Sequence, residues 1–126
     1  MDIRISPSKL KGELNVPASK SCAHRSIICA SLADGVSHLS GVTMSKDIEA
    51  TIGAMTALGA EFEVNGGDIT VKGSGGKNVE KCLVDCNESG STLRFIIPIA
   101  AAVGTETESY ALSAQTASVL NPNLSI

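Results

Sequence analysis

A combination of side chains suited to binding phosphate stands at residues 17–25, which read Pro-Ala-Ser-Lys-Ser-Cys-Ala-His-Arg. Lys20 offers a point charge, Arg25 a planar fork of donors and Ser21 a hydroxyl. Proline is tolerated at or before the first turn of a helix and serine is a favoured N-cap, so a helix is predicted to begin near Lys20. Arg25 then lies one turn after Ser21 on the same face. Because a helix N-terminus has unpaired N–H groups and a positive dipole end, we expect an anion to bind there.

The turn around Gly90 is a second candidate binding site. Residues 89–92 read Ser-Gly-Ser-Thr after a predicted strand, and Arg94 follows within one turn. Glycine lets a backbone N–H approach a ligand closely, and small hydroxyls add donors at a helix start. Taken alone, such a turn is more often a simple helix cap. Its likeness to residues 17–25 favours ligand binding, because open α/β sheets bind ligands where strands lead into helices.

A third glycine-rich stretch and the cysteines favour no further site. Residues 72–77 read Lys-Gly-Ser-Gly-Gly-Lys, without Walker spacing or a helical pattern after them, and we expect a loop there. The cysteines include no Cys-x-x-Cys pair, so we expect no metal, and instead buried or incidental thiols in a reducing compartment. They are Cys22, Cys29, Cys82 and Cys86.

The composition is that of one globular domain. The chain has 126 residues, of which 43% are hydrophobic, so a core of Ile, Val, Leu and Ala is expected. Aromatic residues make up only 2%, and the net charge is −3, which leaves little surface for base stacking or for a polyanion. We therefore expect no nucleic-acid or membrane partner. No stretch has the length of a membrane span or the pattern of a signal peptide, which predicts a cytoplasmic protein.

Strands and helices alternate along the chain, which indicates an α/β (α+β) fold. Ser45 is predicted to cap the second helix and Gly59 to end it. Asn65-Gly66-Gly67 predicts a hairpin turn in which Asn-Gly supplies the positive φ angles. Pro98 counts against a helix in the last apolar run, but a short helix can hold it as a kink. The expected strands cover residues 3–5, 13–16, 36–40, 61–64, 68–71 and 81–85, and the expected helices cover residues 20–33, 46–58 and 95–103.

Four motifs in register resemble the 5-enolpyruvylshikimate-3-phosphate (EPSP) synthase family of enolpyruvyl transferases. They are Pro-x-Ser-Lys-Ser-x-x-x-Arg at 17–25, Ala-x-Gly at 33–35, Ser-x-Asp at 45–47 with Leu-Gly at 58–59, and Glu-Ser-Gly-Ser-Thr-Leu-Arg at 88–94. The resemblance implies a transferase of the shikimate pathway, which serves aromatic amino acid biosynthesis and is the target of glyphosate. It implies no metal and no organic cofactor. It also implies two domains built from βαβαββ units.

By position, the resemblance assigns substrate contacts to four residues. Lys20 would contact phosphoenolpyruvate and lie near shikimate 3-phosphate as well, while Ser21 and Arg25 would hold shikimate 3-phosphate. Gly90 would offer its backbone to phosphoenolpyruvate, and it matches the glycine beside which glyphosate binds in this family. No residue of this chain matches the family's general acid/base groups, so none is expected to be catalytic.

The chain departs from the family after residue 104, which predicts two segments. Residues 1–104 resemble the N-terminal part of an enolpyruvyl transferase, and residues 105–126 read as a divergent tail of unknown origin. Full members of the family are several times longer, so this chain resembles a fragment that is inactive alone. Asp47 and Arg94 also match the family pattern, and we expect them to be structural.

Three functions stay open at this point. The first is an enolpyruvyl transferase fragment that keeps half of each phosphate site. The second is a related enolpyruvyl transferase that acts on a UDP-sugar, which Ser21 disfavours because that relative has Asn after the lysine. The third is a non-catalytic folding or interaction module. An apolar face left uncovered by the absent units would drive self-association in the last case.

Overall fold

The computed structural model describes residues 3–4, 9, 11–14, 16–77, 82–103 and 107–110. Helices and strands alternate over these ranges, as the sequence predicts. The helices are α1 (Lys20–Leu32), α2 (Lys46–Ala57) and α3 (Gly90–Val103). The strands are β1 (Asp34–Leu39), β2 (Glu61–Asn65), β3 (Asp68–Ser74), β4 (Cys82–Asp85) and β5 (Thr107–Tyr110).

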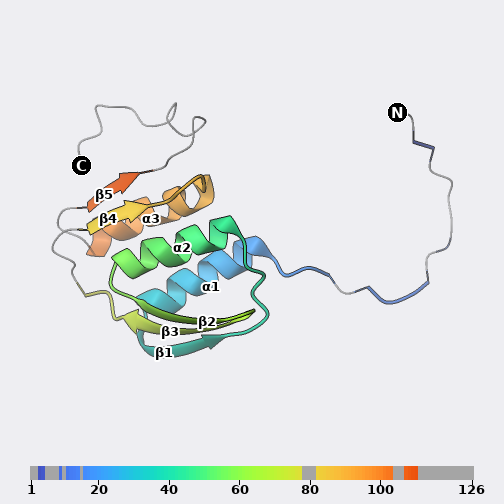
Figure 1. Cartoon of the computed structure of the whole chain (residues 1–126), viewed down its shortest axis with the longest axis horizontal. Helices are drawn as coiled ribbons and strands as arrows, with labels where there is room; N and C mark the ends of the chain where they lie inside the picture. The colour runs from blue at the N-terminus through green and yellow to red at the C-terminus, as the bar shows by residue number, and fades with distance from the viewer. Residues whose placement is uncertain are drawn as a thin grey trace.

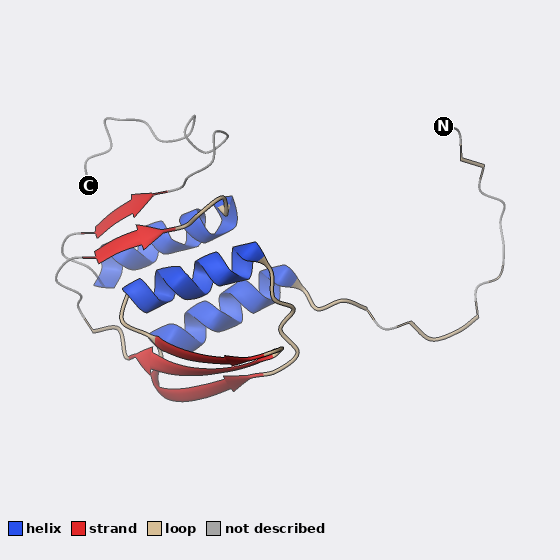
Figure 2. Cartoon of the chain, viewed as in Figure 1, coloured by secondary structure: helices blue, strands red, loops and turns tan. Residues whose placement is uncertain are grey.

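Helices α1 and α2 lie side by side between two separate sheets (Figure 1, Figure 2). The larger sheet has the order β1-β3-β2, and both of its strand pairs are antiparallel. Strands β4 and β5 pair in parallel, and α3 is the crossover between them. Because α2 contacts α1, α3, β2 and β4, it lies at the centre of the described part of the chain.

Two groups of buried side chains hold these layers together, one on each side of α1 and α2. Burying one large aliphatic side chain contributes roughly 1.5 to 3 kcal/mol, so each group is a substantial core. Aliphatic residues dominate both groups, as the composition predicts. The group facing the larger sheet includes Ile27, Ile48, Ile69 and Val71, and the group facing α3 and β4 includes Ile28, Met55, Leu58, Val84, Leu93 and Ile96.

The C-terminal end of α2 follows from local sequence signals. Gly59 has a φ of +93°, a conformation that costs glycine little. Its N–H donates to the carbonyl of Thr56 at 2.9 Å, and the N–H of Ala60 donates to the carbonyl of Met55 at 3.1 Å. This is a Schellman motif, which satisfies the last carbonyls of the helix. The predicted stop at Gly59 is therefore confirmed.

The apolar run after Gly90 is a helix, as predicted, and it already begins at Gly90. Pro98 lies inside α3, where its exposed ring faces away from the core. Proline removes one backbone hydrogen bond from a helix interior, so burial must offset that loss. Ile96 and Ala100 on the opposite face are 0% and 5% exposed, and their burial stabilises the helix against that loss.

The two strands predicted at residues 3–5 and 13–16 do not form over the residues that the structure describes there. Ile3, Leu14 and Val16 are 81%, 85% and 79% exposed and belong to no strand. The segment before α1 leads away from the helices and sheets, so its backbone has no ladder to join (Figure 1). The order α1-β1-α2-β2-β3 therefore forms the expected βαβαββ unit without its first strand.

The hairpin between β2 and β3 is confirmed, but its turn differs from the prediction. Asn65 pairs with Asp68, so the turn consists of Gly66 and Gly67 alone. Only Gly66, at +64°, has a positive φ angle. Asn65 stays in the extended strand because the two glycines are enough to reverse the direction of the chain.

The glycine-rich stretch at residues 72–77 is not all loop, because β3 continues through Ser74. Lys72, Gly73 and Ser74 pair with the first residues of β1. A Cβ atom at Gly73 would collide with the carbonyl oxygen of Ala33 and would lie 2.6 Å from that of Ala30. Glycine is thus required here for the close approach of α1 to the sheet, and the prediction missed this because the contact is not local.

Candidate anion-binding site

The three described helices begin in the same way, with a serine hydroxyl that accepts a hydrogen bond from the N–H three residues later. This is the N-cap arrangement, which leaves the other free N–H groups of the first turn available. The pairs are Ser19 with Cys22 at 3.4 Å, Ser45 with Ile48 at 3.4 Å, and Ser89 with Thr92 at 3.3 Å.

The starts of the three helices adjoin one another. Lys20, the first residue of α1, forms an ion pair with Asp47 in the first turn of α2, with 2.9 Å between Nζ and Oδ2. Oγ1 of Thr92, in the first turn of α3, lies 3.4 Å from the backbone carbonyl oxygen of Asp47. Three positive dipole ends are thereby brought to one region, where an anion would be stabilised.

Lys20 keeps much of its solvent exposure despite the ion pair. The Lys20 and Asp47 side chains are 59% and 40% exposed. The hydrogen bond from Lys20 is the main reason that the pKa of Asp47 is lowered, and a hydrogen bond from the Ser89 side chain acts in the same direction. An exposed pair of this kind is worth about 0.2 to 1 kcal/mol, so a phosphate can compete for the ammonium group.

Arg25 is held in place without using up its donors. Its Nη1 donates to the backbone carbonyl of Ser21 at 3.0 Å, and its guanidinium carbon lies 5.4 Å from the centroid of the Phe95 ring in α3. A guanidinium group over an aromatic face is attracted by the ring quadrupole. Arg25 and Ser21 are both exposed on the first turns of α1, as predicted, so both can reach a ligand.

Gly90 is the first residue of α3 and is exposed. A Cβ atom built at this position would meet nothing within 4 Å. The space on the Cβ side of this residue is therefore open. The β4–α3 connection is the strand-to-helix turn that the sequence predicts, whereas α1 is not preceded by a strand in the described residues.

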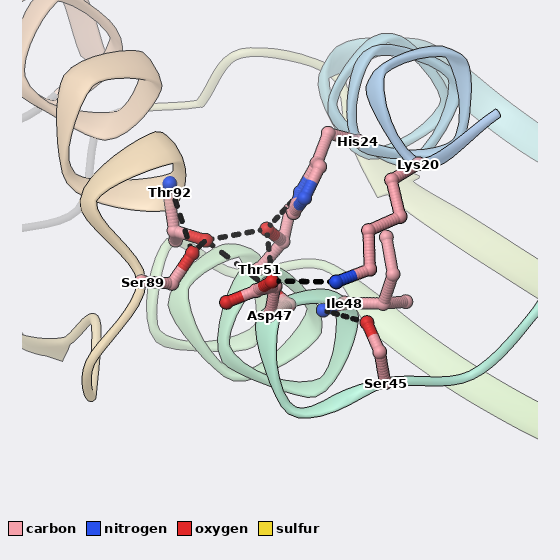
Figure 3. Close-up of polar contacts among 8 residues, drawn as sticks. All are labelled: Lys20, His24, Ser45, Asp47, Ile48, Thr51, Ser89 and Thr92. Carbon is pink, nitrogen blue, oxygen red and sulfur yellow. Dashed lines mark hydrogen bonds and ion pairs between the residues drawn. The ribbon is translucent and has the colours of Figure 1, made fainter. Parts of the chain in front are cut away.

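A buried hydrogen-bond network lies directly beneath these side chains, and sequence reasoning missed it (Figure 3). Nδ1 of His24 lies 2.7 Å from Oγ1 of Thr51, which lies 2.8 Å from Oγ1 of Thr92. Oγ1 of Thr92 in turn donates to Oγ of Ser89 at 2.8 Å. All four side chains are at most 4% exposed. The only indication of this network in the sequence was a polar residue on the inner face of each helix.

Burial keeps His24 neutral. Desolvation is the largest cause of its lowered pKa, Lys20 and Arg25 act in the same direction, and the negative charge of Asp47 opposes them. A protonated imidazole at this position would lose its hydration and would lie near two cations, so the neutral form is favoured. His24 therefore serves as a packing and hydrogen-bonding group beneath the site.

Two hollows of the described surface lie away from these residues. One of about 350 Å³ is lined by residues 38–40 and 68–70, and one of about 340 Å³ lies between the end of α2 and the end of β3. Neither includes Lys20, Arg25 or Gly90. These three residues stand on an open surface of the described chain.

No metal centre is formed by the residues that the structure describes, where no three His, Cys, Asp or Glu side chains gather. Cys22 and Cys29 are exposed, and Cys86 is buried. Burial, with a smaller effect of Asp85, raises the pKa of the Cys86 thiol to about 11. Over the same ranges, no helix combines the length and the apolar character needed to cross a membrane.

Comparisons with known proteins agree on one family. The family model described as EPSP synthase (3-phosphoshikimate 1-carboxyvinyltransferase) matches residues 5–113. The 3-phosphoshikimate 1-carboxyvinyltransferase of Clostridium kluyveri is 47% identical over 104 residues, which cover 82% of this chain and 24% of that protein. The enzyme of the same name from Clostridioides difficile is 46% identical over 110 residues, covering 79% and 25%.

The fold comparison points the same way. EPSP synthase from Acinetobacter baumannii superimposes with a TM-score of 0.73 at 25% identity, and the match covers 82% of this chain and 24% of that one. This chain thus spans about a quarter of the length of the relatives it matches.

Proposed function

Because the chain belongs to the EPSP synthase family, we propose that it supplies part of the active site for enolpyruvyl transfer from phosphoenolpyruvate to shikimate 3-phosphate. Lys20, Ser21 and Arg25 bind shikimate 3-phosphate, and Lys20 with the backbone of Gly90 binds phosphoenolpyruvate. No cofactor is required.

The observation that carries the proposal is the meeting of three helix N-termini beside exposed Lys20 and Arg25. Asp47 offsets one of the two side-chain charges by pairing with Lys20 at 2.9 Å. The dipole ends and Arg25 remain for an anionic ligand, and one phosphate group is the simplest anion that satisfies them.

The chemistry explains why cations are needed. In the transfer, the 5-hydroxyl of shikimate 3-phosphate loses its proton and adds to C2 of phosphoenolpyruvate while C3 is protonated, and loss of phosphate from C2 together with a proton from C3 then restores the double bond. Both reactants are anions that repel each other, so fixed cations that hold them together lower the barrier. The groups that move the protons lie outside this chain, which binds substrate and does not turn it over alone.

Titration calorimetry with shikimate 3-phosphate tests this proposal. Arg25→Ala removes a charge-assisted contact worth about 1.5 to 3 kcal/mol, so its binding should weaken by tenfold or more. Lys77→Ala is the matched control, because it removes an exposed positive charge from the turn after β3, away from the helix starts. It should bind like the unchanged chain.

Phosphate release is assayed in the same sample after phosphoenolpyruvate is added. Binding that depends on Arg25, with no phosphate release, is the expected result. If neither the unchanged chain nor Lys77→Ala binds shikimate 3-phosphate, the proposed substrate site is wrong and the chain is a folding or interaction module. If phosphate is released, the inference that the chain cannot turn over alone is wrong.

The proposed partners are the two small substrates and a second copy of this chain. Self-association would cover Leu83 in β4 and Ile97 in α3, which are 62% and 41% exposed. Nucleic acid and membranes are not among the proposed partners, and the cytoplasm is the proposed location. The division between residues 1–104 and a divergent tail stays a prediction, and residues 105–106 and 111–126 of that tail lie outside the described ranges.

A further inference from the structure

Phe95, in the second turn of α3, is the aromatic residue that reaches the cationic side of α1. The centroid of its ring lies 5.4 Å from the guanidinium carbon of Arg25 and 6.3 Å from the centroid of the His24 ring. The chain has two phenylalanines, one tyrosine and no tryptophan, so aliphatic side chains do nearly all of its packing. An aromatic ring against the proposed phosphate-binding arginine is therefore an uncommon use of this residue type here.

The ring of Phe95 is itself held firmly. It is half-buried and packs against the apolar group that includes Ile28 of α1 and Ile96 of α3. A side chain that is packed on several sides has few rotamers open to it. The ring therefore offers the exposed Arg25 side chain a fixed surface.

Contact with the ring leaves the hydrogen-bonding capacity of Arg25 intact. The ring attracts the guanidinium group through its electron-rich face, and this attraction uses none of the N–H donors. Nη1 of Arg25 donates to the backbone carbonyl of Ser21 at 3.0 Å, which is a second anchor on the side of α1. The guanidinium group is thus held by two contacts of different kinds, and its N–H groups can still form paired hydrogen bonds to a phosphate.

Holding Arg25 in advance favours ligand binding. An exposed arginine samples many rotamers, and a ligand that orders it must offset the lost side-chain entropy. A side chain that is already in position loses less entropy, so the same contacts give a higher affinity. Phe95 can therefore strengthen phosphate binding without touching the phosphate.

We propose that Phe95 is a positioning residue that holds the Arg25 guanidinium group ready for the phosphate group of a ligand. The same contact connects α3, which begins at Gly90, to α1, so that one ring links the two parts of the anion-binding site. The effect of Phe95 on substrate binding rests on the proposed function. The contact between Phe95 and Arg25 does not, and it can be measured without any ligand.

Side-chain NMR spectra of the ligand-free chain test the contact. Protons above an aromatic ring are shifted upfield by its ring current, so the Arg25 δ-proton signals should lie upfield and should move downfield in Phe95→Leu. Phe95→Tyr keeps the aromatic face and should keep the upfield position. Phe62→Leu is the matched control, because Phe62 is also half-buried and packs against the same apolar group, but lies on β2. It should leave the Arg25 signals in place.

Titration calorimetry with shikimate 3-phosphate tests the consequence for binding. Loss of a contact between a cation and an aromatic ring changes an equilibrium constant by roughly two- to fivefold at an exposed site, and Phe95→Leu should weaken binding by that factor. Phe95→Tyr and Phe62→Leu should bind like the unchanged chain. In an Arg25→Ala background, Phe95→Leu should cause no further loss, because Phe95 acts through Arg25. A purely structural role predicts that the two losses multiply.

Three results would overturn the proposal. They are Arg25 signals that are the same in Phe95→Leu and in the unchanged chain, equal binding by these two proteins, and a loss on Phe95→Leu that is equally large with and without Arg25. A different result separates the proposed function from this inference. If the unchanged chain does not bind shikimate 3-phosphate although its Arg25 signals depend on Phe95, the contact is supported and the proposed function alone is overturned.

Discussion

At the scale of single residues, His24 is the group whose environment departs furthest from what its neighbours in sequence suggest. It lies between Ser21 and Arg25, which are exposed, yet only 4% of its own surface is accessible. Position 24 faces inward, toward the α2 and α3 side chains that pack against α1, while Ser21 and Arg25 share the outer side one turn apart. The sequence predicted that Ser21 and Arg25 share one face of the helix, and it did not reveal which side chains His24 contacts.

The lowered pKa of His24 makes folding depend on pH. Free histidine has a pKa near 6.5, so below that pH the unfolded chain takes up a proton that the folded chain resists. The free energy of unfolding should therefore be constant between about pH 7 and 8, below the range where the raised pKa of Cys86 matters, and fall between about pH 6.5 and 5.5. Urea denaturation at several pH values measures this slope. His24→Asn should flatten it.

The other histidine provides the control. His38 lies on β1 and not in the helix layer, so His38→Asn leaves His24 in place and should retain the slope. Measurements stay above pH 5.5 because Asp47, whose pKa is lowered, adds its own loss of stability at more acidic pH. An unchanged slope in His24→Asn would show that burial of this imidazole is not coupled to folding.

At the scale of elements, the contact between α1 and β3 depends on Gly73. Gly73→Ala would place a Cβ atom against the Ala33 carbonyl and 2.6 Å from that of Ala30, and backbone atoms cannot move aside as a flexible side chain can. We expect a loss of roughly 1 to 3 kcal/mol in the free energy of unfolding. Gly53→Ala is the matched control, because Gly53 lies inside α2 with nothing within 4 Å of its Cβ position. It should gain about 1 kcal/mol from helix propensity.

Urea denaturation of both variants checks this pair of opposite effects. A Gly73→Ala protein as stable as the unchanged chain would mean that α1 shifts on the sheet at little cost. Loss of stability in Gly53→Ala would mean that packing around α2 differs from the structure.

The elements that could be predicted are those whose ends depend on nearby residues. Ser45 and Gly59 set the ends of α2 by hydrogen bonds that span a few residues, so the sequence alone was enough. The strand expected at residues 13–16 failed because a strand depends on its partner, and no described strand lies beside it. The hydroxyl network was missed for the same reason, since Thr51 and Thr92 meet only after α2 and α3 pack.

At the scale of the whole molecule, exposed apolar side chains lie in the layers on both sides of α1 and α2. Leu83 in β4 and Ile97 in α3 belong to the layer that lies across α1 and α2 from the larger sheet (Figure 1). The chain spans about a quarter of the length of its relatives, and the described residues leave Leu83 and Ile97 62% and 41% exposed. Apolar surface of this kind favours association with a second copy.

Sedimentation velocity over a range of concentrations should therefore show a species larger than the monomer. Leu83→Lys combined with Ile97→Lys places charges in the buried interface and should return the protein to the monomer. Val36→Lys combined with Val64→Lys is the charge-matched control, because these residues are 60% and 41% exposed in the larger sheet on the other side of the helices. A protein that is monomeric throughout, or an assembly that only the control pair disrupts, would show that the layer of β4 and α3 is not the associating surface. Because the Arg25 and Gly90 contacts lie at the helix starts, the two pairs of variants should bind shikimate 3-phosphate equally well. Association and substrate binding can then be separated in one set of proteins.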